Sequence, residues 1–140
     1  MRPASAVFVG TARDCAGWLP NVLANLAKLS RLYDRAAFIF VVSDATDATA
    51  QLLRDWMGTE RAGKVVDLGE LAGRFQRRTE RIAFARNVCL EEVSGSEFAE
   101  YRHLVVADMD DVLAAPLDVD SYVRALQWLD AAPDRAAVFA

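Results

Sequence analysis

The 140-residue sequence has one histidine, two cysteines and no long hydrophobic run. A membrane-spanning helix needs roughly 18–20 consecutive apolar residues, and the apolar stretch that begins at Ala6 is too short for a signal peptide. Cys15 and Cys89 stand far apart and outside any CxxC pattern, so neither a disulfide framework nor a zinc site is indicated. With His103 as the only histidine, no Ser-His-Asp or Cys-His arrangement can be argued. These absences favour a cytoplasmic protein.

An excess of one charge is also missing. The chain has 16 Lys and Arg against 20 Asp and Glu, for a net charge of −4, and 54% of its residues are hydrophobic. This balance argues against intrinsic disorder and against a dedicated nucleic-acid binder. The length predicts a single domain over residues 1–140, in which about two thirds of the unfolded chain's surface can be buried.

Hydrophobic runs alternate with segments of helical periodicity along the chain. This alternation predicts an α/β fold whose mainly parallel sheet carries helices on both faces, in a Rossmann-like arrangement. Because the last predicted strand reaches the final residue, we expect the chain to be the N-terminal part of a longer protein. The predicted strands are 6–9, 38–42, 64–68, 103–107 and 136–140, and the predicted helices are 18–29, 47–56, 77–93 and one capped by Asp120 and Ser121.

Ligands of open α/β sheets bind outside the carboxyl ends of the strands, and three polar clusters follow predicted strands. They are Gly10 to Asp14, Ser43 with Asp44, and the acidic group of Asp108, Asp110 and Asp111. The first cluster lacks GxGxxG, and no GxxxxGK[ST] occurs anywhere, so an ordinary dinucleotide site or P-loop is excluded. Asp44 either accepts hydrogen bonds from a base or ribose, or caps the following helix.

The acidic cluster carries the most chemistry. Asp108 and Asp110 form a DxD pair after a buried strand, and two neighbouring carboxylates are normally neutralised by a divalent cation. Mg²⁺ or Mn²⁺ binds through one or two carboxylates together with phosphate oxygens of a substrate. The alternative is that Asp110 and Asp111 only cap a turn.

A second group of charges complements the first. Five arginines but only one acid, Glu80, occupy residues 74–86, and arginine binds phosphate oxygens bidentately. Arg81 and Arg86 are the candidates for a diphosphate, whereas Arg77 and Arg78 are interpreted as parts of a solvated helix face. The five are Arg74, Arg77, Arg78, Arg81 and Arg86.

The order of these elements resembles the nucleotide-binding half of a GT-A glycosyltransferase. The segment from Arg81 to Leu90, followed by the segment from Leu104 to Val112, further resembles the capsular α-1,3-mannosyltransferases. The resemblance implies a donor such as a GDP- or UDP-sugar, bound with Mn²⁺ or Mg²⁺, and an acceptor that stays open. Asp110 and Asp108 would bind the metal ion, and Asp108 would also lie near the ribose. The nucleotide would be surrounded by Thr11, Ala12, Arg13 and Asp44, with Arg81 and Arg86 near the diphosphate and sugar.

Two other functions stay open. The residues fit a non-catalytic nucleotide-binding module equally well, since a catalytic carboxylate of such enzymes belongs to a later part of the chain. Residues 105–113 also resemble the first motif of haloacid dehalogenase-like phosphatases, which would use Asp108 and Asp110. That family needs a downstream Lys and Thr or Ser, and the sequence has no Lys or Thr after Leu113.

Overall fold

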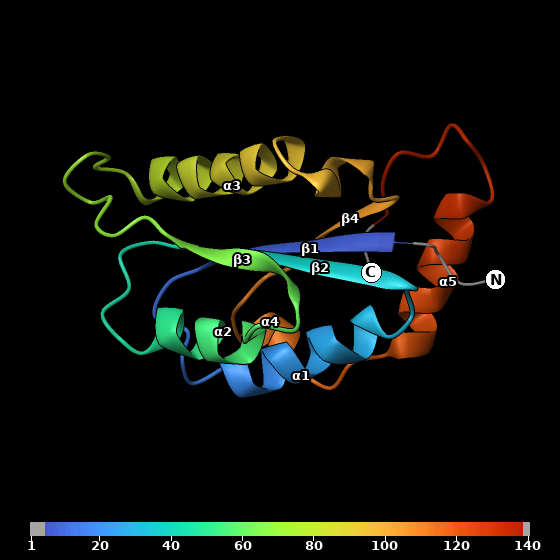
Figure 1. The fold of residues 1–140 in the computed structure, drawn as a ribbon, viewed down its shortest axis with the longest axis horizontal. Coiled ribbons are helices and arrows are strands. Elements are labelled where there is room, and N and C mark those ends of the chain that lie inside the picture. The colour runs from blue at the N-terminus through green and yellow to red at the C-terminus, as the bar shows by residue number, and fades with distance from the viewer. Residues whose placement is uncertain (1–4, 139–140) are drawn as a thin grey trace.

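A computed structural model describes residues 5–138 as a layered α/β fold. Its sheet has four parallel strands in the order β3-β2-β1-β4 (Figure 1). The α/β class and the parallel sheet predicted from the sequence are therefore confirmed. The strands are β1 (Ser5–Ala12), β2 (Arg35–Val42), β3 (Ala62–Asp67) and β4 (His103–Val106); the helices are α1 (Leu19–Ser30), α2 (Thr49–Met57), α3 (Arg78–Ser94), η1 (Glu97–Glu100), α4 (Asp111–Ala114) and α5 (Val119–Asp130).

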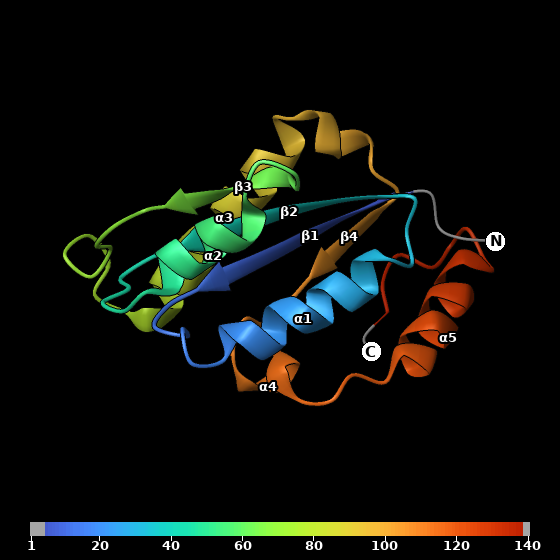
Figure 2. The same ribbon diagram turned by 60° about the horizontal axis from the view of Figure 1, so that its bottom comes forward.

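The two central strands are buried on both faces. Phe8, Phe38 and Phe40 face the cluster that contains α1 and α2, while Val9 and Ile39 face the cluster that contains α3. Figures 1 and 2 show α1 and α2 on one side of the sheet and α3 on the other. An uninterrupted apolar run is the signature of such a covered parallel strand, which explains why these segments were recognisable.

Local signals set most helix ends. Pro20 lies in the first turn of α1, where its missing N–H leaves no bond unmade. Gly58 ends α2 with a φ of 53°, a conformation that glycine adopts at little cost. The last helix differs from expectation: Asp118, rather than Asp120, caps α5 by accepting hydrogen bonds from the N–H and hydroxyl of Ser121. The short helix α4 was not predicted.

Two strand predictions need correction. β1 extends through Thr11 and Ala12, because its ladder with β2 continues to Ala12 opposite Val42. The predicted fifth strand is not formed over residues 136–138, and residues 139–140 lie outside the described residues. Ala136 and Ala137 are exposed, so ordering them in a ladder would bury little apolar surface against the entropy cost.

One polar contact ties α5 to the sheet. His103 is the buried first residue of β4, the position at which the predicted strand also begins. Its Nε2 lies 3.1 Å from Oδ1 of Asp130, the last residue of α5, and Arg102 donates to the same oxygen at 2.9 Å. Asp130 therefore holds the end of α5 at the amino end of the sheet, where Figure 1 shows this helix.

We expect Asp130→Asn to lower the free energy of unfolding by about 1 kcal/mol near neutral pH. Burial opposes ionisation of Asp130, but the hydrogen bonds from Arg102 and His103 outweigh it and hold its pKa below the ordinary value. The wild-type advantage is thus present above an aspartate pKa of about 3.9 and is lost as pH falls through the lower folded-state pKa. Thermal melts should converge for the two proteins at about pH 2. A difference that is the same at both pH values would contradict this role.

Candidate functional site

A cleft of about 190 Å³ lies at the carboxyl ends of the strands, beneath the first turns of α3. All eight residues that the sequence singled out for nucleotide or metal binding line it, although they come from four separate segments of the chain. They are Thr11, Ala12, Arg13, Asp44, Arg81, Arg86, Asp108 and Asp110. Sequence reasoning missed Cys15, Arg78, Ile82, Ala85 and Met109, which complete the lining together with Ser43, a member of the predicted polar cluster after β2.

Two carboxylates fasten the loops that form the floor of the cleft. Asp14 Oδ1 accepts a hydrogen bond from the Thr46 N–H at 2.6 Å, and Asp47 Oδ2 accepts one from the Ala16 N–H at 3.1 Å. Each loop after a central strand thus holds the backbone of the other. Burial opposes ionisation of Asp47, but the hydrogen bonds from Thr49 and Ala16 together outweigh it and lower its pKa. These two acids are engaged with backbone and do not line the cleft.

Asp44 does not cap α2, as one interpretation of the sequence held. Its Oδ1 accepts hydrogen bonds from the N–H groups of Leu71 and Ala72, at 2.7 and 3.0 Å. Its backbone φ is 51°, a left-handed conformation that Asp and Asn tolerate better than most residues. The carboxylate therefore closes the loop between β3 and α3 against the end of β2. Its other oxygen, Oδ2, is buried and has no hydrogen-bond partner among residues 5–138.

Met109 separates the two carboxylates of the DxD pair. Its side chain is 3% exposed and packs against Gly10, where a Cβ would stand only 2.6 Å from the Met109 Cγ. The glycine in β1 therefore makes room for Met109. With this residue anchored in the core, Asp108 and Asp110 on either side of it are exposed and line the cleft. Asp110 Oδ1 also accepts the Val112 N–H at 3.2 Å and caps α4, so the turn-cap interpretation and cleft placement both hold for this residue.

Three arginines of α3 line the same cleft as these acids. Arg81 and Arg86, the candidates for a diphosphate, line the cleft, and so does Arg78, which the sequence assigned to a solvated face. Arg77 does not line the cleft. The Nε of Arg81 is buried without a hydrogen-bond partner in the described part of the chain, which leaves a donor available.

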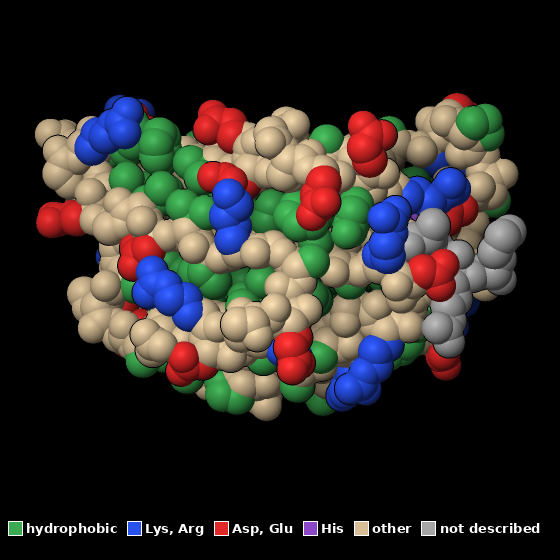
Figure 3. Space-filling model, viewed as in Figure 1, with side chains coloured by type: hydrophobic (Ala, Val, Ile, Leu, Met, Phe, Trp, Pro, Cys, Tyr) green, Lys and Arg blue, Asp and Glu red, His purple; other side chains and the backbone are tan. Residues whose placement is uncertain are grey.

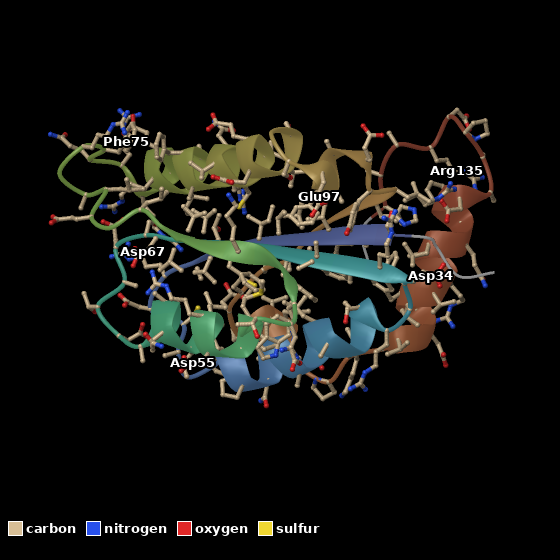
Figure 4. The ribbon with its side chains drawn as sticks, in the orientation of Figure 1. Asp34, Asp55, Asp67, Phe75, Glu97 and Arg135 are labelled. Carbon is tan, nitrogen blue, oxygen red and sulfur yellow. The ribbon has the colours of Figure 1, made fainter. Side chains whose placement is uncertain are left out.

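Arg74 belongs to a separate aromatic cluster rather than to the cleft. Its guanidinium lies over the rings of Phe75 and Phe84, at 5.1 and 4.8 Å from their centroids. The two rings are 5.1 Å apart. Figure 4 shows Phe75 in the loop that precedes α3 and Asp67 at the end of β3. This stacking holds the loop against α3, and Arg74 is not among the lining residues.

The two thiols are unsuited to nucleophilic chemistry. Burial raises the pKa of Cys15, and it raises the pKa of Cys89 to about 11. The thiolate is the nucleophilic form of cysteine, and at neutral pH both side chains therefore stay protonated. The Cys15 N–H donates to the hydroxyl oxygen of Thr49 at 3.0 Å, so this residue is held by the same loop network.

The donor set of the cleft fits only an open cation site. Within residues 5–138 no three His, Cys, Asp or Glu side chains are placed to hold a metal ion together. Asp108 and Asp110 offer carboxylate oxygens, the ligands that Mg²⁺ and Mn²⁺ prefer, and such ions commonly take their remaining ligands from water and substrate phosphates. The residues therefore fit a cation that arrives with a phosphate-bearing ligand.

We expect Asp44→Ala to accelerate amide hydrogen exchange at Leu71 and Ala72 by roughly tenfold, because both N–H groups lose a charged acceptor. Asp44→Asn is the matched control: it tolerates the left-handed backbone and keeps one acceptor oxygen, so its effect should be smaller. Exchange followed residue by residue by NMR would measure both. Unchanged rates at Leu71 and Ala72 in the alanine variant would contradict the clamp.

Comparison with known proteins adds no relative: no protein-family model, curated protein or solved structure matches the chain. None of the helices within residues 5–138 combines the length and apolar character that crossing a membrane requires.

Proposed function

We propose that the cleft binds a nucleoside-diphosphate sugar together with Mn²⁺ or Mg²⁺, and that the chain is the donor-binding part of a glycosyltransferase. The observation that carries the proposal is the division of charge across one cleft. Arginines of α3 and the carboxylates that follow β4 come from different elements and line the same cleft. A diphosphate with its cation needs both signs within reach, since it presents anionic oxygens to the protein and a positive ion to the acids.

The arginines and the carboxylates of the cleft have different roles in this proposal. Arg81 and Arg86, with Arg78, would donate hydrogen bonds to the diphosphate, and the unpartnered Nε of Arg81 supports that assignment. Asp110 and Asp108 would supply oxygens to the cation, which neutralises the diphosphate when it is bound.

The nucleoside would lie along the ends of β1 and β2. Thr11, Ala12 and Arg13 line the cleft from β1 and the residue after it, and Asp44 lines it from the end of β2. Because Oδ1 of Asp44 already accepts two backbone N–H groups, only Oδ2 is left for a base or ribose. That oxygen is buried, so its use requires a small shift of the 69–72 loop.

The cleft supports this function better than a phosphatase. A haloacid dehalogenase-like enzyme places a lysine beside its nucleophilic aspartate, and no lysine is among the residues that line the cleft. The cations on α3 are instead arginines, whose planar guanidinium groups can donate two hydrogen bonds at once to phosphate oxygens.

We expect wild-type protein to bind GDP or UDP, or a sugar conjugate of either, more tightly with Mn²⁺ than without it, as measured by isothermal titration. Asp110→Ala should raise the Kd in the presence of Mn²⁺ by roughly tenfold or more. Asp111→Ala is a matched control, because Asp111 is the exposed neighbour that does not line the cleft. Affinity that is absent, or that is indifferent to both Mn²⁺ and Asp110, would refute the donor site.

The arginines can be tested without the metal. Arg86→Gln should weaken binding of the nucleoside diphosphate by roughly tenfold, because a charge-assisted contact to phosphate is lost. Arg77→Gln, one position before α3 and outside the cleft, should leave the Kd within about twofold of wild type. Equal losses in the two variants would mean that general charge, rather than the cleft, attracts the ligand.

Turnover separates a transferase from a binding module and from a phosphatase. A donor-hydrolysing protein releases nucleoside diphosphate from the sugar conjugate, and we expect Asp110→Ala to abolish that release. A binding module shows affinity with no release. A phosphatase hydrolyses a simple phosphomonoester and loses that activity in Asp108→Asn, a result that would replace the glycosyltransferase proposal.

A further inference from the structure

The outer edge of β4 is an open strand edge with a distinctive row of side chains. β4 is the last strand in the sheet order, and its outer side pairs with no strand in residues 5–138. Leu104 and Val106 are 46% and 63% exposed, because α3 packs over β1 and β2 and leaves this face of β4 uncovered. The flanking residues on the same face are charged. We define the edge row as the exposed residues Arg102, Leu104, Val106 and Asp108.

The backbone at the centre of the edge row also faces outward, whereas at its start the Arg102 N–H donates inward to the Ser5 hydroxyl at 3.0 Å. The Ala107 N–H donates to the Val9 carbonyl at 2.9 Å, so the odd-numbered residues of this segment direct their main-chain groups toward β1. The main-chain groups of Leu104 and Val106 consequently point away from the sheet, and neither forms a cross-strand bond to another described segment on that side. An apolar edge with free N–H and C=O groups is a template for pairing with another strand.

The opposite edge of the sheet is protected in a way that β4 is not. Lys64 of β3 pairs with Glu92 of α3, and Asp67 of β3 lies 3.8 Å from Arg54 of α2. Figure 3 views the molecule from the β3 side and shows charged side chains spread among the apolar ones. Charged side chains on an edge strand oppose pairing with other chains. On β4 the central pair of the edge row is apolar.

We propose that β4 pairs antiparallel with β4 of a second copy of this chain, forming a continuous eight-stranded sheet. Along the strand, the edge row has a cation, two apolar residues and an anion. When a second copy runs in the opposite direction, its anion faces the cation of the first copy and the apolar residues face each other. In the register that sets Leu104 opposite Val106 of the second copy, Arg102 falls opposite Asp108. Leu104 and Val106, whose main-chain groups face outward, then lie opposite each other, as hydrogen-bonded antiparallel pairs require, and the Arg102 and Asp108 side chains flank them as opposite charges. A two-fold axis between the Val105 residues of the two copies relates one half of the contact to the other.

The contact would extend beyond the strand itself. Leu90, 46% exposed, follows Arg86 by one turn of α3 on the same stripe, and Arg86 lines the cleft together with Asp108. A four-residue strand alone buries too little area for a stable interface, and we assign the additional apolar contact to Leu90. Arg102 is 56% exposed and donates to Asp130 through one nitrogen, leaving other N–H groups of its fork for Asp108 of the second copy.

The inference also links assembly to the cleft without depending on the proposed ligand. Asp108 lines the cleft and belongs to the edge row, so a second copy would bring a cation to the rim of each site. Dimerisation and ligand binding are measured separately. A failed nucleotide titration leaves the dimer proposal intact, and a monomeric protein leaves the donor-site proposal intact.

Sedimentation velocity over a range of concentrations tests the proposal. We expect wild type to approach twice the chain mass of 15.4 kDa. Val106→Lys should raise the dimer Kd by roughly tenfold or more, because two ammonium groups enter the apolar centre of the edge. Val112→Lys is the matched control: Val112 is equally apolar and 68% exposed on α4, away from the strand, and its dimer Kd should not change. If the protein is a monomer at every concentration up to about 1 mM, any dimer Kd is weaker than that, and the proposal is overturned. A dimer that Val106→Lys leaves intact overturns it too.

The register has its own test. Arg102→Glu and Asp108→Arg should each weaken the dimer, and the double variant should recover most of the loss, because the charges are exchanged but still opposite. Because Arg102 also bonds Asp130, circular dichroism melts must show that each variant is folded. The neutral pair, Arg102→Gln with Asp108→Asn, gives a second measurement: its combined effect should be smaller than the sum of its single effects. Purely additive effects in both sets would rule out this register.

Discussion

The fold depends on the burial of β1 and β2 on both faces. Phe8 and Phe40 on one face and Val7, Ile39 and Val41 on the other are at most 1% exposed. Parallel strands buried in this way require a crossover helix after each strand, and α1, α2 and α3 meet that need on opposite sides of the sheet. The loops that leave the strands then all open at one edge, and this is where the cleft forms. The site is a consequence of how the core is covered.

The acidic residues around the cleft divide into two kinds with different uses. Asp14, Asp44 and Asp47 accept backbone N–H groups and fix the loops. Asp108 and Asp110 stay exposed on either side of the buried Met109. The first kind holds the loops together through backbone hydrogen bonds, whereas the second presents charge to the cleft. The number of acidic residues does not distinguish these roles. The first set differs because backbone N–H groups of another loop lie within hydrogen-bonding distance of its carboxylates.

The sequence was most informative where the signal was local. Continuous apolar runs located the four strands, and Pro20 and Gly58 marked helix ends. It failed where the outcome depended on distant partners: Arg78 lines the cleft because of how α3 lies across the sheet, and Asp44 clamps a loop 27 residues away. The strand predicted over residues 136–140 had a suitable composition, yet residues 136–138 form no strand and Ala136 and Ala137 stay exposed.

The sequence by itself determined the class of fold and the chemical types at the strand ends, since apolar periodicity and short polar clusters are properties of neighbouring residues. Only the tertiary structure decided which clusters meet. It brought eight candidate residues from four segments into one cleft, and it left β4 at an open edge with Arg102, Leu104, Val106 and Asp108 in one row. The physical reason is that strand order and helix placement are set by long-range packing, and no short window of sequence contains that information.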